Sequence, residues 1–202
     1  MNAQNNTLSM FTGIIQEIGT IKKITQDGDN KVVEIEAKTT LKDCKKGGSI
    51  CVNGICSTVM NISDSEFSVE YMPETLKLTT VQDWQEKESV NLESSLTLSD
   101  KLSGHFVAGH VDAVGKIINI KENDFDISFP PEIAKFIAFK GSITVDGISL
   151  TVSKLDDEHF TVSIIPHTLE NTTLGKKIVS DTINLEVDLI SRYLQRFADL
   201  SN

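Results

Sequence analysis

One block of this sequence occurs twice at a constant separation, and this duplication limits the folds open to the chain. Residues 48–59 read GSICVNGICSTV and residues 141–152 read GSITVDGISLTV, so equivalent positions differ by 93 in number. The same shift aligns two further blocks: Pro73-Glu74-Thr75-Leu76 with Pro166-His167-Thr168-Leu169, and Val90-Asn91-Leu92-Glu93 with Ile183-Asn184-Leu185-Glu186. A constant offset over three separated blocks indicates two homologous units, and therefore two similar pockets.

Length and charge narrow the function classes. The 202 residues divide into two units of about 90 residues. Units of this size bury only a modest fraction of their surface, so we expect each to pack against the other or against further subunits. The net charge of −10 argues against a nucleic-acid or anionic-membrane partner. No apolar run approaches the roughly 18 residues of a membrane helix, and residues 1–9 lack a signal peptide's apolar stretch, so we expect a cytoplasmic protein.

The cysteines and short motifs predict neither a disulfide framework nor a cofactor. Cys44, Cys51 and Cys56 are odd in number and show no C-x-x-C spacing, which argues against disulfides and against a zinc site. The sequence has no P-loop, no dinucleotide-binding glycine motif and no cluster of metal ligands. We therefore expect no metal and no cofactor.

Apolar and polar residues alternate with a period of two in several segments, including 66–71, 125–129, 160–164 and 183–187. Such segments, separated by turn sequences, are typical of half-buried antiparallel strands and predict an all-β barrel or sandwich for each unit. Helices are expected at 131–139, more weakly at 40–45, and at 190–200. The apolar stripe of the last helix fits packing on its own barrels or assembly of subunits.

The turn and strand at 146–151 are the strongest candidate for a binding site. Gly147 allows a flat ring to approach the backbone closely, and Ser149 and Thr151 point to the same face of a strand. The plainer interpretation is an Asp-Gly hairpin turn with surface hydroxyls. Their counterparts in the first unit are Cys56 and Thr58, so the two pockets are predicted to be unequal.

The chain resembles the riboflavin synthase family in four motifs taken in order. These are MFTGII at 10–15 followed by Gly19, GHFVAGH at 104–110, DGISLT at 146–151 and LENTTLG at 169–175. The resemblance covers residue 10 to about residue 198, nearly the whole chain. Each motif alone is weak, but their order and the internal duplication make the match specific.

The resemblance implies two homologous six-stranded antiparallel Greek-key barrels and a C-terminal amphipathic helix that joins three chains into a homotrimer. The implied boundaries are an N-terminal extension or tag at 1–9, lumazine-binding barrels at 10–105 and 106–189, and a trimerisation helix at 190–202. The implied reaction converts two molecules of 6,7-dimethyl-8-ribityllumazine into riboflavin and 5-amino-6-ribitylaminouracil, at sites between chains. Association with lumazine synthase is left open.

The resemblance also assigns roles to residues. Ser149, Asp188, Cys56 and His105 are the implied catalytic residues, with His105 at the mouth of the N-terminal pocket; a purely structural His105 is the alternative. The implied substrate-binding residues are Gly13, Ile14, Ile15, Ser49, Cys56, Ser57, Thr58, Glu70, Tyr71, Met72, Pro73, Glu74, Thr75, Gly109, His110, Val111, Lys140, Ser149, Leu150, Thr151, Ile165, Pro166, His167, Thr168, Leu169 and Glu170.

Departures from internal symmetry and from the family pattern qualify this assignment. Asp188 has Ser95 as its counterpart, and His167 replaces the acid present at Glu74, which puts its contact with the ribityl hydroxyls in doubt. In the family, the motif at residues 10–13 opens the chain, whereas nine residues precede it here. These nine residues are expected to crowd the pocket if they are retained. A non-catalytic lumazine- or flavin-binding protein of the same fold is the alternative; the presence of Ser149, Thr151 and Asp188 favours the enzyme.

Overall fold

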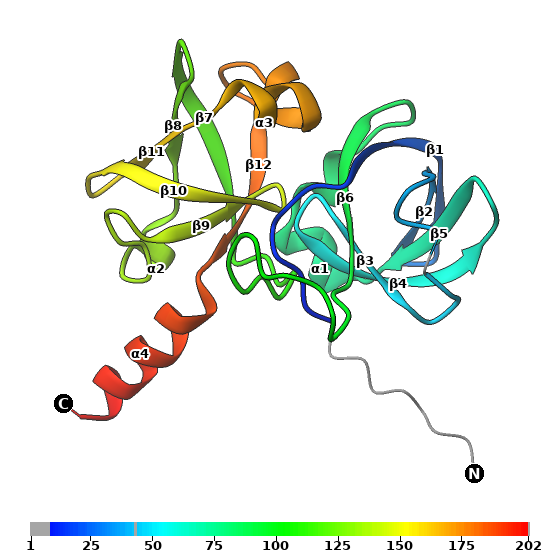
Figure 1. Cartoon of the computed structure of the whole chain (residues 1–202), viewed down its shortest axis with the longest axis horizontal. Helices are drawn as coiled ribbons and strands as arrows, with labels where there is room; N and C mark the ends of the chain where they lie inside the picture. Colours follow the sequence, from blue (N-terminus) through cyan, green and yellow to red (C-terminus); the bar gives the residue numbers. More distant parts are fainter. Residues whose placement is uncertain (1–8, 43, 202) are drawn as a thin grey trace.

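Two closed antiparallel β-barrels lie side by side in the computed structural model, which describes residues 9–42 and 44–201 (Figure 1). The first barrel contains β1 (Glu17–Asp27), β2 (Asn30–Glu36), β3 (Ser49–Val52), β4 (Ile55–Ile62), β5 (Glu66–Tyr71) and β6 (Ser89–Ser94). The second contains β7 (Ala113–Lys121), β8 (Asp124–Ser128), β9 (Ser142–Val145), β10 (Ile148–Leu155), β11 (His159–Ser163) and β12 (Thr182–Val187).

The two barrels have the same strand order. The first runs β1-β2-β5-β4-β3-β6 before closing on β1, and the second runs β7-β8-β11-β10-β9-β12 before closing on β7. The step from β2 to β5 skips two strands, as in a Greek key. Register is conserved too, since Cys51 pairs with Cys56 where Thr144 pairs with Ser149. The predicted pair of six-stranded barrels is confirmed.

The alternation of residue types explains these strands. Phe67 and Val69 in β5 and Phe160 and Val162 in β11 are buried in two separate apolar cores, one inside each barrel. Closing the sheet leaves no free edge, which suits a small all-β unit. The predicted period of two is therefore confirmed in both halves.

The barrels meet through buried amide side chains related by the repeat. Asn91 Nδ2 donates to the carbonyl of Asp146 at 2.9 Å, and Asn184 Nδ2 donates to the carbonyl of Asn53 at 2.8 Å. Each amide oxygen accepts a backbone N–H from the opposite barrel, at Thr173 and Thr80 respectively. Buried polar groups satisfied across an interface in this way fix the relative position of the barrels.

Short helices interrupt the strand pattern. They are α1 (Pro73–Leu78), 3₁₀ helix η1 (Thr80–Asp83), α2 (Pro131–Ala134), α3 (Pro166–Asn171), 3₁₀ helix η2 (Thr173–Lys176) and α4 (Leu189–Leu200). The helix expected at 131–139 covers only residues 131–134. Residues 40–42 form a turn and residues 44 and 45 have no regular structure, so the expectation of a helix at 40–45 is wrong for the described residues. Helices α1 and α3 were not predicted.

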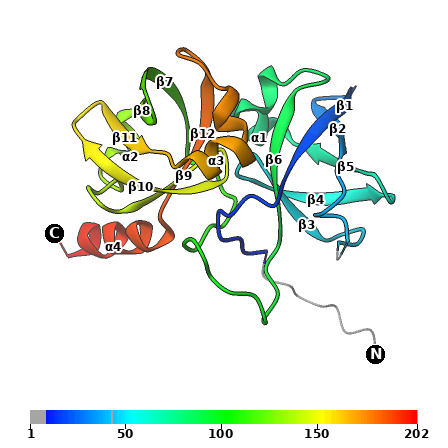
Figure 2. The ribbon, with the colours of Figure 1, turned by 45° about the horizontal axis from the view of Figure 1, so that its top comes forward.

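Helix α4 agrees with the prediction for the end of the chain. It begins directly after β12 and projects from the second barrel, as Figures 1 and 2 both show. Its apolar side chains are 57–71% exposed: Ile190, Tyr193, Leu194, Phe197 and Leu200. Within the described part of the chain, no helix is long and apolar enough to cross a membrane.

Candidate functional site

Two extended segments cross between the barrels and bring the candidate residues together. We call residues 10–15 the first arm and residues 106–111 the second arm. They pair antiparallel near their N-terminal ends, where Phe11 N donates to Val107 O at 2.8 Å and Val107 N donates to Phe11 O at 3.1 Å. Figure 1 shows the blue first arm and the green stretch of the second running between the barrels. Each arm precedes the first strand of its own barrel but reaches the other barrel.

The first arm lines the surface of the second barrel at Ser149. Ser149 N donates to the carbonyl of Gly13 at 2.8 Å, and Gly13 has φ of +77°. A Cβ added to Gly13 would lie 2.6 Å from Ser149 N, so only glycine fits this contact. Ile14 is exposed beside it, and Ile15 packs against the core of the second barrel. We call this surface the C-terminal pocket, after the pocket predicted at these residues.

His105 also belongs to the C-terminal pocket. Its Nδ1 lies 2.7 Å from Ser149 Oγ and its Nε2 lies 3.2 Å from Thr144 Oγ1. The expectation that His105 lies at the N-terminal pocket is therefore wrong. The chain contacts the second barrel at His105, and the second arm reaches the first barrel only at the residues that follow. Burial lowers the pKa of His105, and the nearby Asp188 charge opposes that shift by raising it. A neutral ring at pH 7 can accept a proton.

Asp188 stands between β12 and α4. Its Oδ1 accepts the N–H of Ile190 at 2.9 Å, so it caps the helix while its charge acts on His105. A role for Asp188 follows from the family resemblance, whereas its capping role was not predicted. Thr151 is exposed on the same strand face as the half-buried Ser149. The C-terminal pocket thus combines a carboxylate, an imidazole and hydroxyls.

The second arm lines the first barrel in the equivalent way. Cys56 N donates to the carbonyl of Gly109 at 2.8 Å, and Gly109 has φ of +75°. A Cβ added to Gly109 would lie 2.7 Å from Cys56 N. His110 is exposed and Val111 packs on the core of the first barrel. We call this surface the N-terminal pocket.

The N-terminal pocket has different chemistry from its counterpart. Burial raises the pKa of the Cys56 thiol, although hydrogen bonds from Ser49 and Ser9 lower it, so the thiol stays protonated at neutral pH. Ser9 Oγ lies 2.7 Å from Ser49 Oγ. Ser9 precedes the first arm as His105 precedes the second, so a serine stands where the other pocket has a histidine. The rest of the expected extension, residues 1–8, lies outside the described residues.

Some predicted substrate contacts point elsewhere. Ser57 and Tyr71 are buried inside the first barrel, where their hydroxyls lie 2.9 Å apart, while Cys56 and Thr58 face outward. The side-chain period of a strand separates these two sets. Glu70 accepts a hydrogen bond from Asn30 Nδ2 at 2.8 Å and is half-buried.

The two proline motifs open helices. Pro73 and Pro166 occupy the first helical turn of α1 and α3, a position that proline tolerates because its missing N–H has no helical partner. Met72 and Ile165 precede them and are exposed. The remaining predicted residues of these helices are half-buried or exposed: Glu74, Thr75, His167, Thr168, Leu169 and Glu170.

Other predicted residues lie apart from the pocket centres. Lys140 is exposed with φ of +64°, and its Nζ lies 5.3 Å from the centre of the Phe139 ring. Leu150 pairs with Ile143 and packs against the core of the second barrel. Leu169 and Glu170 line a hollow of about 380 Å³ beside the β7–β8 hairpin, a hollow that Ser149 does not line.

Gly147 does not face a ligand, contrary to expectation. It has φ of +81° and packs against Gly54 of the equivalent turn, where an added Cβ would meet Gly54 N at 2.8 Å. Asp146 is likewise buried at the barrel interface, 3.5 Å from Lys177 Nζ. The Asp-Gly turn therefore joins the barrels, and only the strand that follows it reaches the pocket.

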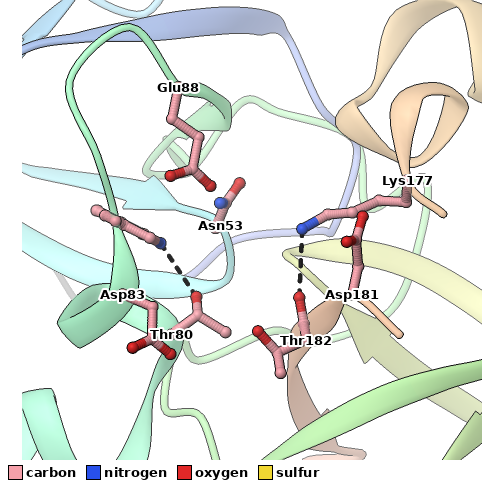
Figure 3. A pocket seen from close by; sticks show the side chains of 8 residues that line it. Asn53, Thr80, Asp83, Glu88, Lys177, Asp181 and Thr182 are labelled. Carbon is pink, nitrogen blue, oxygen red and sulfur yellow. Dashed lines mark hydrogen bonds between the residues drawn. The ribbon is translucent and has the colours of Figure 1, made fainter. Parts of the chain in front are cut away.

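A polar cavity of about 240 Å³ lies between the barrels and shares no residue with the predicted site (Figure 3). Residues that line the cavity form hydrogen bonds with one another: Trp84 Nε1 donates to Thr80 Oγ1, and Lys177 Nζ donates to the carbonyl of Thr182. Across the described chain, no group of three or more histidine, cysteine, aspartate or glutamate side chains is placed to hold a metal ion.

Residues missed by sequence reasoning support both pockets. Thr144 completes the hydrogen bonds of His105. Glu93 accepts N–H groups of the first arm, and Glu186 accepts N–H groups of the second. The two glutamates stand at equivalent positions of the repeat, so the duplication contained a signal for them that only the folded contacts explain.

Comparison with known families matches both halves. The lumazine binding domain family matches residues 12–95 and residues 108–188. The riboflavin synthase of Bacillus amyloliquefaciens is 43% identical over 192 residues, covering 93% of this chain and 89% of the relative. The riboflavin synthase of Schizosaccharomyces pombe is 38% identical over 196 residues, covering 94% of each chain.

Solved structures of LumP have the same double-barrel fold. LumP complexed with riboflavin superposes with a TM-score of 0.80 at 25% identity, covering 88% of this chain and 98% of that chain. LumP complexed with 6,7-dimethyl-8-(1'-D-ribityl) lumazine superposes with a TM-score of 0.78 at 24% identity and the same coverage. The fold is therefore one that other proteins use around lumazines and flavins.

Proposed function

The chain belongs to the riboflavin synthase family, and we propose that it converts two molecules of 6,7-dimethyl-8-ribityllumazine into riboflavin and 5-amino-6-ribitylaminouracil. The observation that carries this proposal is identity of about 40% to riboflavin synthases over more than 90% of the chain, in a protein with two lumazine-binding domains. Two similar pockets suit a reaction between two identical molecules.

The proposed C-terminal site contains Ser149, Thr151, His105 and Asp188, closed by the first arm. The proposed N-terminal site contains Cys56 and Thr58, closed by the second arm. We propose that Ile165 and Met72, which are exposed directly before α3 and α1, contact ligand rings from the side. Unequal polar groups on equal backbones support unlike roles for the two bound molecules, as donor and acceptor of carbon.

The chemistry needs little beyond these groups. A lumazine ring is electron-poor, so its 7-methyl group can lose a proton while the ring holds the charge. We propose that neutral His105 takes this proton, directly or through Ser149 Oγ, 2.7 Å away. Hydroxyl groups of Ser149 and Thr151 donate to charge that develops on the heterocycle.

Carbon transfer follows from holding two substrates together. One molecule gives up a four-carbon unit, its ring carbons 6 and 7 with their methyl groups, and the other receives it. The two substrates contain all the atoms of both products, and the proton taken from the methyl group is available to the nitrogens that the departing unit leaves. Holding the two reactants in contact can lower the activation free energy of the reaction by up to about 7–11 kcal/mol.

We also propose that three chains assemble through α4, with each active site formed by the N-terminal barrel of one chain and the C-terminal barrel of another. The exposed apolar stripe of α4 supports assembly, because a monomer would leave it in water. We place the barrel boundaries at 10–105 and 106–189, so that each arm belongs to the barrel that follows it.

A non-catalytic pigment-binding protein is the second candidate, since the LumP structures share the fold. Their identity of 24–25% is well below the 38–43% found with riboflavin synthases, which favours the enzyme.

The test is to mix the purified protein with 6,7-dimethyl-8-ribityllumazine alone and follow riboflavin absorbance. Steady formation of riboflavin is expected; stable lumazine fluorescence without product would support the pigment-binding alternative. Within the same assay, Ser149→Ala should lower turnover by about 10²–10³-fold, the cost of one donor aimed at developing charge. Thr58→Ala should cost less, and equal losses would refute the proposed inequality of the pockets.

A further inference from the structure

Each pocket is completed by an arm whose backbone N–H groups donate to a buried carboxylate. Glu93, near the end of β6, accepts Thr12 N at 2.7 Å and Thr12 Oγ1 at 2.8 Å on one oxygen, and Gly13 N at 2.9 Å on the other. Glu93 is only 2% exposed. The first arm is therefore fixed to the first barrel, although its Gly13 carbonyl contacts the second.

Glu186, near the end of β12, repeats this arrangement. Its Oε1 accepts Ala108 N at 2.8 Å, and its Oε2 accepts Gly109 N at 3.0 Å and His110 N at 3.1 Å. It too is 2% exposed. The second arm is therefore fixed to the second barrel, although its Gly109 carbonyl contacts Cys56 of the first.

The contacts that Gly13 and Gly109 make with the opposite barrel are too close for any further atom. The missing Cβ of Gly13 would stand 2.6 Å from Ser149 Cβ, and that of Gly109 would stand 2.7 Å from Cys56 Cβ. A shift of either arm by a few tenths of an ångström would change the wall of the pocket it lines. Close packing transmits such shifts rather than absorbing them.

We infer that Glu93 positions the C-terminal pocket and Glu186 positions the N-terminal pocket, so that the buried carboxylate of each barrel sets the geometry of the pocket in the other barrel. Both are positioning residues that act through backbone N–H groups. The inference rests on the proposed function in one respect, namely that the surfaces at Ser149 and Cys56 are the ligand pockets.

The arm held by Glu186 is also hydrogen-bonded to helix α4, and among the described residues the arm held by Glu93 has no such link. Arg192 of α4 donates to Asp112 Oδ2 at 2.8 Å and to the carbonyl of His110 at 3.0 Å, directly beside the residues that Glu186 holds. Asp112 in turn accepts Val187 N at 2.8 Å. The terminal helix is thus tied to the arm of the N-terminal pocket, while no helix follows β6 in that way among the described residues.

Thiol labelling tests the crossed assignment without substrate. Cys56 is a natural thiol at the N-terminal pocket, and Ser149→Cys places a matched thiol at the C-terminal pocket. In that background Glu186→Gln and Glu93→Gln are treated with iodoacetamide, and each modified position is read by peptide mass spectrometry. Glutamine keeps the size of the side chain but replaces one acceptor oxygen with a donor.

Glu186→Gln should raise the labelling rate of Cys56 by about fivefold or more, as expected when hydrogen bonds of the closed arm are lost, and leave the introduced thiol within about twofold. Glu93→Gln should do the reverse. Cys51 is buried beside both arms and reports general unfolding, so its labelling should stay slow. If either glutamine variant unfolds, Glu93→Asp and Glu186→Asp take its place, keeping the charge but shortening the reach.

Several results would overturn the inference. Each variant could open the pocket of its own barrel, both pockets could respond equally to one variant, or neither could respond. A protein that binds lumazine without turnover would fail the assay of the proposed function yet still show crossed labelling, so the two tests fail separately.

Discussion

A histidine lies between two hydroxyl groups in the C-terminal pocket. His105 contacts Ser149 Oγ and Thr144 Oγ1 through its two ring nitrogens, and only burial and the charge of Asp188 compete for its pKa. Burial is the larger influence, so the pKa lies below its ordinary value. The ring is therefore neutral, and able to accept a proton, over the whole neutral range.

Asp188→Asn tests this electrostatic link. Asparagine is as good a helix cap as aspartate, so α4 should keep its start. Loss of the negative charge removes the influence that raises the pKa of His105, so the acid limb of the kcat/KM profile should move to lower pH. Turnover at neutral pH should fall by about tenfold, the effect of one partly screened charge near the reacting groups.

The measurement is a pH–rate profile of wild type and variant, with circular dichroism as the check on folding. An acid limb that moves to higher pH, or does not move, would contradict a role of Asp188 through His105.

At the scale of elements, the arms depend on glycines with positive φ. Gly13→Ala should cost about 3 kcal/mol or more of unfolding free energy, because left-handed strain adds to overlap with Ser149 N. Gly28→Ala is the matched control: its φ is +59° in the β1–β2 turn, but nothing lies within 4 Å of the added Cβ. The control should lose only the strain of about 1–2 kcal/mol.

Urea unfolding gives both values, and the same two variants are assayed for turnover. We expect activity to be lost at Gly13 and kept at Gly28. Equal destabilisation at the two positions would mean that the contact with Ser149 contributes nothing beyond backbone strain.

The strands were predictable from the sequence and the helices largely were not, for a physical reason. Alternation in β5 and β11 reflects one face in a core, and this signal is local. Helices α1 and α3 are six residues long with no fully buried residue, too short for a stripe to develop. Residues 40–42 show the converse, an apparent helical start that forms a turn, where the Glu17 carboxylate accepts Thr40 N at 2.7 Å.

The site was predictable only as far as the repeat and the resemblance reach. Ser149 and Cys56 stand on equal backbones, as their register in the repeat requires. The location of His105 was not predictable, since residues before a strand can approach either barrel. The same holds for Glu93 and Glu186, whose partners lie about 80 residues away in the chain.

At the scale of the whole molecule, the proposed assembly depends on α4. Removing residues 191–202 should leave a monomer without synthase activity, because the proposed active site needs two chains. This deletion also removes the bonds of Arg192 to the second arm, so Phe197→Glu is the sharper variant: it places a charge on the exposed apolar stripe and leaves Arg192 in place. Light scattering after gel filtration measures the assembly, and Arg196→Gln, on the same helix, is the control.

An active monomeric variant would end the shared-site proposal. A trimeric but inactive Phe197→Glu variant would instead mean that the helix serves catalysis by a route other than assembly.

The exchange of arms between the barrels has a consequence for ancestry and for synthesis. In a chain with one barrel and one such arm, the pocket could be completed only by the arm of a second copy. The two copies would exchange arms, as in a domain-swapped homodimer. In this chain the two homologous halves make that exchange internally, while the side chains at the two contacts differ, Ser149 in one and Cys56 in the other. On the ribosome, the first arm is made early and must wait for Ser149, more than a hundred residues later, before its pocket can close.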